Sequence, residues 1–205
     1  MADAGERLAS VNGTVTASDQ AVIPALDPGF LRGYGTYELV RLYSGKPFAL
    51  EEHLERLRHS ANGLRLRLDG DTLRGEIDAL VARAAGADCY LRIVVTASGL
   101  RVLSLEECAA PRSYRLGVEV HAPTPLLRGV KSLSYAANVL ATRRAAERGF
   151  DDCLLVSPGG QVLEASTAAV FWFEGDRLCT PPLSEGILDS ITRRTIMRAR
   201  PADEV

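Results

Sequence analysis

Three short stretches in the second half of the chain contain side chains that could do chemistry. Lys131 precedes a predicted helix, and its amine is a nucleophile and a proton carrier. Glu164 lies in the stretch GQVLEAST, where its carboxylate could hold a proton or a cation. The stretch that ends in Ser190–Arg193 is predicted to begin a last helix, and the amide groups at a helix start bind anions. An amine, a carboxylate and an anion-binding helix start are therefore the candidate parts of a site.

Each of these residues also has an ordinary explanation when it is taken alone. A single lysine before a helix is usually solvated, and Glu164 could be a surface carboxylate. Ser190 could serve only as a helix cap. The one other lysine, Lys46, lies in a predicted hairpin turn and is a poor alternative, because a hairpin tip is usually in water. The order and spacing of the three stretches therefore carry more weight than any single residue.

Composition excludes several classes of protein. The 205 residues are 46% hydrophobic and 24% charged, which is ordinary for a globular protein with a real core. A net charge of −2 gives no field for nucleic acid or an anionic membrane, and no apolar run approaches the roughly 20 residues that a membrane helix needs. The N-terminal sequence lacks a secretory signal, so we expect a cytoplasmic protein.

No metal site is expected. The histidines have no metal-ligand spacing with one another or with a cysteine, and the cysteines are widely spaced, which favours reduced, buried thiols over disulfides or zinc ligands. These residues are His53, His59, His121, Cys89, Cys108, Cys153 and Cys179.

The periodicity of apolar residues predicts strands, then two helices, then strands in the first half of the chain. Leu54, Leu57, Ala61 and Leu64 form one apolar stripe, so we expect a helix over 51–66. The further elements expected in this half are a helix over 71–85, a short strand over 11–15 that the turn pair Asn12-Gly13 breaks, and strands over 37–43, 47–50, 90–96 and 101–105. In the second half we expect strands over 114–121, 153–156, 161–163, 168–173 and 177–180, and helices over 134–148 and 190–200. Residues 27–29 are expected to form a loop.

This pattern predicts two α/β domains. The segment Ala122–Leu126 contains two prolines and is expected to be an extended, stiff connection. We therefore expect a small domain over 1–117, a linker over 118–128 and a larger domain over 129–205.

Taken together, the motifs resemble the aminotransferase class IV family of pyridoxal 5′-phosphate (PLP) enzymes, which includes branched-chain aminotransferase, D-amino-acid aminotransferase and aminodeoxychorismate lyase. The resemblance rests on the three stretches above and on Tyr37-Glu38, Arg41, His53–Leu57 and Ser60-Ala61, and it runs from about Asn12 to Arg193. It implies the α/β (α+β) PLP fold type IV, with a small N-terminal α/β domain and a larger, β-rich C-terminal domain, and a homodimer. Relative to that family the chain is short at its C-terminus.

The resemblance also implies roles for individual residues. Lys131 matches the lysine that forms a Schiff base with PLP, and Glu164 matches the carboxylate that keeps the pyridine nitrogen protonated. The remaining cofactor contacts that it implies are the phosphate ligands Arg56, Ile191 and Thr192, the phenolate partner Tyr135, and Ser166 and Thr167 beside the ring. Tyr37 matches a residue of the substrate-binding wall.

Several of these residues keep an alternative explanation. Arg56 could lie on an exposed helix face beside Glu52, one helical turn earlier. Tyr37 could be a core residue of its strand. Ser166 and Thr167 could be loop hydroxyls that bond the local backbone.

The function implied is amino-group transfer between an amino acid or amine and a 2-keto acid through Lys131. Family members that act as lyases often depart from Tyr-Glu at the positions of Tyr37 and Glu38, which favours transamination here. The alternatives are an aminodeoxychorismate lyase that releases pyruvate and 4-aminobenzoate, and a class IV scaffold that acts through its dimer surface and not as an enzyme. The sequence does not identify the amino donor, its stereochemistry or the acceptor.

Overall fold

The computed structural model describes residues 7–108 and 113–205, which divide into two units. The first unit contains the described residues through 108 together with Val130–Ser134, and the second contains 113–129 and Tyr135–Val205. Residues 1–6 and 109–112 of the predicted first domain lie outside this description. The two units divide the chain differently from the predicted domains: Val130–Ser134 falls in the first unit and residues 113–117 in the second, and residues 118–120 of the predicted linker belong to a strand.

A six-stranded antiparallel sheet forms the first unit, in the order β2-β1-β6-β5-β3-β4. The strands are β1 (Leu8–Val11), β2 (Thr14–Ala17), β3 (Gly35–Tyr43), β4 (Lys46–Pro47), β5 (Cys89–Thr96) and β6 (Arg101–Glu107). The predicted hairpin of β5 and β6 is confirmed. β3 pairs along its length with β5, whereas on its other edge β4 covers only Leu42 and Tyr43.

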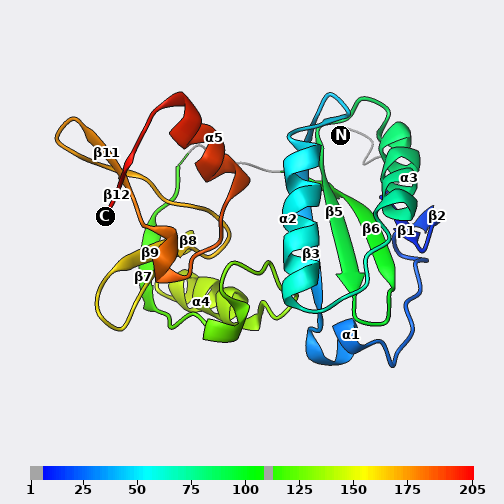
Figure 1. Ribbon diagram of the computed structural model, residues 1–205, viewed down its shortest axis with the longest axis horizontal. Coiled ribbons are helices and arrows are strands. Elements are labelled where there is room, and N and C mark those ends of the chain that lie inside the picture. Colours follow the sequence, from blue (N-terminus) through cyan, green and yellow to red (C-terminus); the bar gives the residue numbers. More distant parts are fainter. Residues whose placement is uncertain (1–6, 109–112) are drawn as a thin grey trace. The chain divides into compact units, whose positions relative to one another are not determined.

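Two helices bury one face of this sheet (Figure 1). They are α2 (Leu50–Gly63) and α3 (Gly70–Val81), and α3 continues into a 3-10 turn, Ala82–Ala84. The core joins Leu57 of α2 and Ile77 of α3 to Leu42, Leu91 and other strand residues that are almost fully buried. The apolar stripe predicted for α2 therefore faces the sheet.

The expected loop over 27–29 is instead the start of a short helix, α1 (Pro28–Arg32). The Asp27 side chain accepts a hydrogen bond from the Gly29 amide at 2.7 Å, and Pro28 occupies the first helical position. An aspartate cap followed by proline is a helix start signal, which the turn-like Asp-Pro-Gly sequence obscured.

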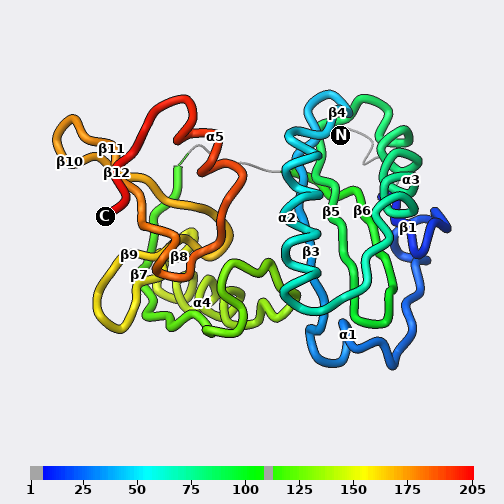
Figure 2. The backbone as a smooth tube through the Cα atoms, in the orientation of Figure 1, coloured from blue at the N-terminus to red at the C-terminus, as the bar shows by residue number. Residues whose placement is uncertain are grey.

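The second unit contains two three-stranded sheets, β7-β8-β9 and β10-β11-β12. Helix α4 (Ala136–Glu147) connects β7 to the parallel strand β8 and lies next to both (Figure 2). The strands are β7 (Leu116–Val120), β8 (Asp152–Val156), β9 (Val162–Ala165), β10 (Trp172–Glu174), β11 (Arg177–Thr180) and β12 (Asp203–Glu204). The last helix is α5 (Ile191–Ala199), and 3-10 turns occur at Pro125–Leu127 and Leu183–Glu185. The segment predicted as a strand over 168–173 is mostly irregular, and only its last two residues belong to β10.

All four cysteines are free thiols, and three of them are buried. Burial raises the pKa of the Cys89 and Cys153 thiols, which keeps them protonated near neutral pH. Within residues 7–108 and 113–205, no cluster of three or more histidine, cysteine or acidic side chains could hold a metal ion. No helix of the described chain is both long and apolar enough to cross a membrane.

Candidate active site

Lys131 is fixed to the first unit through its backbone. The segment Val130–Ser134 lies along the free edge of β3, where the Leu133 amide donates to the Gly35 carbonyl at 2.9 Å and the Tyr37 amide donates to the Lys131 carbonyl at 3.2 Å. An isolated antiparallel bridge joins Thr36 to Ser132. The segment therefore acts as a short extra strand beside the part of β3 that β4 leaves uncovered.

Glycine makes this close approach possible. A Cβ atom at Gly35 would lie 2.6 Å from Cδ1 of Leu133 and 2.7 Å from the Val95 carbonyl oxygen, distances that real Cβ atoms do not reach. A Cβ at Gly63, the last residue of α2, would lie 2.9 Å from Cγ2 of Val130. The glycines thus form the slot that receives the segment carrying Lys131.

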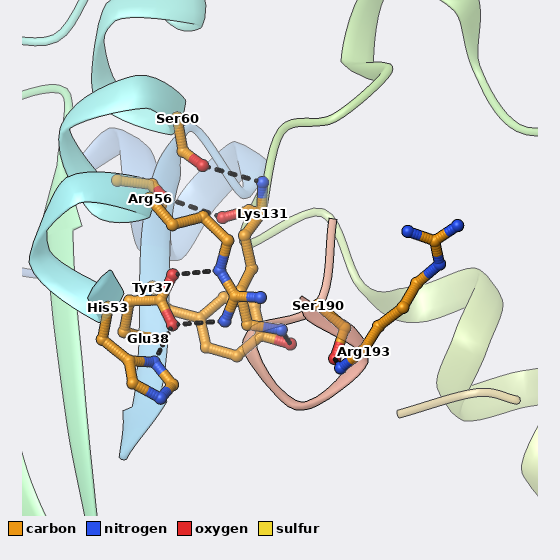
Figure 3. A network of polar contacts seen from close by, with 9 residues as sticks. Tyr37, Glu38, His53, Arg56, Ser60, Lys131, Ser190 and Arg193 are labelled. Carbon is orange, nitrogen blue, oxygen red and sulfur yellow. Dashed lines mark hydrogen bonds and ion pairs between the residues drawn. The ribbon is translucent and has the colours of Figure 1, made fainter. Parts of the chain in front are cut away.

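The side chain of Lys131 extends to Tyr37 (Figure 3). Its Nζ lies 3.4 Å from the Tyr37 hydroxyl oxygen and 4.4 Å from the centre of the ring, which is a cation–π distance. Tyr37 is only 7% exposed, and the guanidinium of Arg92 lies over the same ring at 5.5 Å. The lysine predicted to react and the tyrosine predicted to form the substrate wall are therefore direct neighbours.

Arg56 belongs to a buried charged network with Glu38 and His53 (Figure 3). Its Nε and one terminal amino group donate to the two carboxylate oxygens of Glu38 at 2.8 and 2.7 Å, and Nδ1 of His53 lies 2.7 Å from the same carboxylate. Glu38 is fully buried and Arg56 is 7% exposed. The alternative that placed Arg56 on an exposed helix face is wrong, because this face of α2 packs on the sheet.

The charge of Glu38 is stabilised by its partners. Burial alone would raise the pKa of the Glu38 carboxyl, but the hydrogen bonds and positive charge of Arg56, with a further contribution from His53, outweigh that effect and lower the pKa. Glu38 is therefore ionised at neutral pH and holds the Arg56 guanidinium in one orientation.

In the second unit, Glu164 is half-buried in β9. Its Oε2 accepts a hydrogen bond from the Leu188 amide at 3.3 Å, which ties β9 to the stretch before α5. This bond orients the Glu164 carboxylate within the second unit.

Tyr135 and Ser166 are neighbours within the second unit. The Tyr135 hydroxyl donates to the Ser166 carbonyl, and the amide side chain of Asn138 donates to the same oxygen at 2.9 Å. The Ser166 hydroxyl donates to Asp152 at 2.5 Å, whereas Thr167 is exposed. Because the single proton of Tyr135 is already donated, its oxygen can accept a hydrogen bond, but donation to a cofactor would require the Ser166 contact to break.

The predicted anion site is the beginning of α5. Ser190 caps this helix and accepts a hydrogen bond from the Arg193 amide at 3.3 Å. Ile191 is buried and Thr192 is exposed at the first two helical positions. The cap explanation of Ser190 is thus correct, and it is compatible with an anion near the amides of Ile191 and Thr192 because the hydroxyl occupies a different one.

Sequence reasoning assigned no role to Thr36 or Ser60, which contact the backbone of Lys131. The available signal was the position of polar residues on a buried helix face. His53, Arg56 and Ser60 recur at steps of three and four residues and follow the apolar stripe of α2. Polar side chains on such a face need buried partners, which here are Glu38 and the Lys131 amide.

Comparison with known proteins identifies relatives of this chain. The family model described as amino-transferase class IV matches residues 35–204, which includes β3, α2, Lys131 and Glu164. The chain belongs to the aminotransferase class IV family. Members of this family bind pyridoxal phosphate or pyridoxamine phosphate.

Relatives within the class IV family differ in reaction. A putative branched-chain-amino-acid aminotransferase of Methanocaldococcus jannaschii is 30% identical over 92% of this chain and 73% of its own length. An aminodeoxychorismate lyase of Bacillus subtilis is also 30% identical, over 91% of this chain and 71% of its own length. A solved fold IV transaminase from Curtobacterium pusillum has a TM-score of 0.87 and 26% identity, over 97% of this chain and 82% of that one. The expected family and the mixed α/β fold are confirmed, while transferase and lyase are not separated by similarity.

Proposed function

We propose that this class IV protein is a PLP-dependent aminotransferase in which Lys131 carries the cofactor. The observation that carries the proposal is the position of the lysine: its backbone is hydrogen-bonded to side chains of β3 and α2, and its amine lies against Tyr37. The exposed Lys46 is the first residue of β4, beside the turn of the β3–β4 hairpin, and has no comparable setting. When bound, PLP supplies an aldehyde that captures an amine and a ring that withdraws electrons from the adjoining carbon.

Lys131 has two tasks in this proposal. Its Nζ holds the cofactor aldehyde, and after displacement by the substrate amine it moves a proton at the substrate α-carbon. Tyr37 confines the amine from one side, since its hydroxyl and ring are both within reach of Nζ. As a wall residue, Tyr37 also limits the space beside the substrate.

The remaining residues would hold the cofactor. The carboxylate of Glu164 is suited to keep a proton on the ring nitrogen, because the Leu188 amide fixes its direction. The amides of Ile191 and Thr192 and the guanidinium of Arg56 are the proposed phosphate donors. In this role Glu38 orients the Arg56 guanidinium through two hydrogen bonds. Ser166 and Thr167 are proposed to lie beside the ring.

We propose transamination because Tyr-Glu stands at positions 37 and 38, where lyase members of the family often differ. The second candidate is an aminodeoxychorismate lyase, favoured by the Bacillus subtilis relative that is as similar as the aminotransferase relative. The substrates in the first case are an amino acid or amine and a 2-keto acid.

Replacement of the lysine tests the proposal. Lys131→Ala is expected to lose amino transfer by about 10⁴-fold or more, because it removes the proton carrier as well as the covalent anchor. Lys46→Ala serves as the matched control and should keep wild-type turnover, since its side chain is exposed. Wild-type turnover by Lys131→Ala would reject the assignment.

A panel of reactions separates the two candidates. Purified protein is incubated with PLP, a series of L- and D-amino acids, and either 2-oxoglutarate or pyruvate, and the new amino acid is quantified. A parallel reaction contains aminodeoxychorismate without any keto acid, and pyruvate is measured. Transfer of one amino group per donor consumed supports transamination, whereas pyruvate release in the parallel reaction supports the lyase.

A further inference from the structure

Two buried hydroxyl groups bind the backbone of Lys131 from different elements of the first unit. The Thr36 hydroxyl, on β3, donates to the Lys131 carbonyl at 2.8 Å. The Ser60 hydroxyl, on α2, accepts a hydrogen bond from the Lys131 amide at 3.0 Å. Both side chains are fully buried, so neither hydroxyl can exchange its partner for bulk water.

These contacts fix the backbone position from which the flexible Lys131 side chain extends. Lysine has four rotatable side-chain bonds, so the position of Nζ is defined only if the Cα atom is held and the far end meets a wall. The two hydroxyls hold the peptide groups on both sides of Cα, and Tyr37 is the wall at 3.4 Å from Nζ. A displacement of about 1 Å at a reacting group can cost about 10²-fold in rate.

The two hydroxyls are also far from Lys131 in the sequence. Thr36 precedes it by 95 residues and Ser60 by 71. One additional main-chain bond, from the Tyr37 amide, reaches the same carbonyl. The Thr36 bond is therefore a second bond to a carbonyl that the strand pairing already occupies, and the Ser60 bond supplies an acceptor for the Lys131 amide from another element.

We infer that Thr36 and Ser60 are positioning residues that place the Lys131 amine for reaction with an aldehyde. The inference rests on the proposed function, in which that aldehyde belongs to PLP. Neither residue touches the reacting atoms, and both act through the peptide groups of Lys131.

The variants for a test are Thr36→Val, which keeps the shape and removes the donor, and Ser60→Ala. Thr36→Ser retains the donor and should restore wild-type behaviour. Ser10→Ala is the matched control, because Ser10 is an equally buried serine of the same sheet whose hydroxyl has no hydrogen-bond partner among the described residues. Thermal unfolding of every variant identifies any that fail to fold. If Ser60→Ala fails to fold, the pair Thr36→Val and Thr36→Ser decides the question.

The first readout is the apo protein treated with an acetylating reagent, followed by peptide mass spectrometry. The chain has only two lysines, so the exposed Lys46 is an internal reference in every sample. The ratio of acetylation at Lys131 to acetylation at Lys46 is expected to differ from the wild-type ratio by about threefold to tenfold in Thr36→Val and in Ser60→Ala. This range corresponds to the free energy of one net hydrogen bond. Ratios equal to wild type in both variants would overturn the inference.

The second readout uses PLP itself. The Lys131 amine condenses with the aldehyde and releases water, and borohydride then reduces the carbon–nitrogen double bond to a stable secondary amine that mass spectrometry locates. We expect trapping at Lys131 to slow by about tenfold or more in the two variants. For amino transfer, kcat should fall by a larger factor than the factor by which KM changes. Normal trapping and normal kcat in both variants would also overturn the inference.

Failure of the proposed function gives a different result. If the wild-type protein traps PLP no better at Lys131 than at Lys46, then Lys131 is not the cofactor lysine. The acetylation ratios, which involve no cofactor, still decide whether the two hydroxyls control the amine.

Discussion

The candidate residues of the two units are held in different ways. In the first unit, Lys131 and Arg56 are bound by buried side chains from β3 and α2, and the partners lie 18 to 95 residues away in the sequence. In the second unit, Glu164 is half-buried and accepts a hydrogen bond from the Leu188 amide, and Thr167 is exposed. The difference is one of burial: the side chains that bind Lys131 and Arg56 are fully buried in the first unit, whereas Glu164 and Thr167 are partly or fully open to solvent in the second.

The largest effect on stability is expected from substitution of Glu38, whose side chain is fully buried in the first unit. Glu38→Gln should reduce the free energy of unfolding by about 3–5 kcal/mol, because it removes the buried negative charge that pairs with the Arg56 guanidinium. The measurement is urea unfolding at pH 7. The matched control is Glu106→Gln, which removes a half-exposed partner of Arg92 in the same sheet and should cost about 1 kcal/mol or less.

The pH dependence of this difference provides the contradicting outcome. Because folding lowers the pKa of Glu38, its contribution to stability is fully present above the unfolded pKa of about 4.3 and is lost as the pH falls through the folded pKa. The gap between wild type and Glu38→Gln should therefore narrow below about pH 4. A gap that stays constant down to pH 3 would mean that the charge of Glu38 is not what stabilises the unit.

A smaller effect is expected where the extra strand meets β3. Gly35→Ala should cost about 1–3 kcal/mol, because the new methyl group would overlap Leu133 and the Val95 carbonyl. Gly75→Ala is the control: this glycine lies in α3 with open space around it, so alanine should stabilise the protein by about 1 kcal/mol. If both substitutions stabilise the protein, then the slot for Val130–Ser134 is not tightly packed.

The smallest effect is expected in the second unit. Ser166→Ala removes the hydrogen bond to Asp152 and should cost about 1 kcal/mol, since Thr142 still donates to the same carboxylate at 3.0 Å. The neighbouring Thr167→Ala should stay within about 0.5 kcal/mol of wild type, because that side chain is exposed. A cost for Ser166→Ala as large as that for Glu38→Gln would remove the contrast between the units.

Local patterns predicted most of the elements but few of their contacts. The stripe of Leu54, Leu57 and Ala61 was sufficient for α2, and the alternation around β5 and β6 was sufficient for their hairpin. The helix α1 was missed because five residues are too few to show a period, and the strand expected over 168–173 is shorter because apolar residues alone do not guarantee a pairing partner.

The candidate site was predicted only as far as sequence motifs extend. Lys131 and Tyr37 belong to separate motifs. Their proximity depends on the pairing of Val130–Ser134 with β3, which no local sequence pattern predicts. The same reason applies to Glu38, which was recognised as part of a motif although its bonds to Arg56 and His53 arise only when α2 packs on β3. Tertiary pairing, which the sequence does not encode locally, decides these contacts.

The docking of Val130–Ser134 on β3 has a consequence for how the protein is made. Synthesis proceeds from the N-terminus, and early parts of a chain can fold while later parts are still being added. The helices and six strands of the first unit can therefore assemble while the edge of β3 at Gly35–Tyr37 is still open, and an open edge can pair with other chains. That edge is closed only once Val130–Ser134 has been synthesised and has docked, so the step that protects the nascent sheet from aggregation also fixes Lys131, the lysine proposed to carry the cofactor.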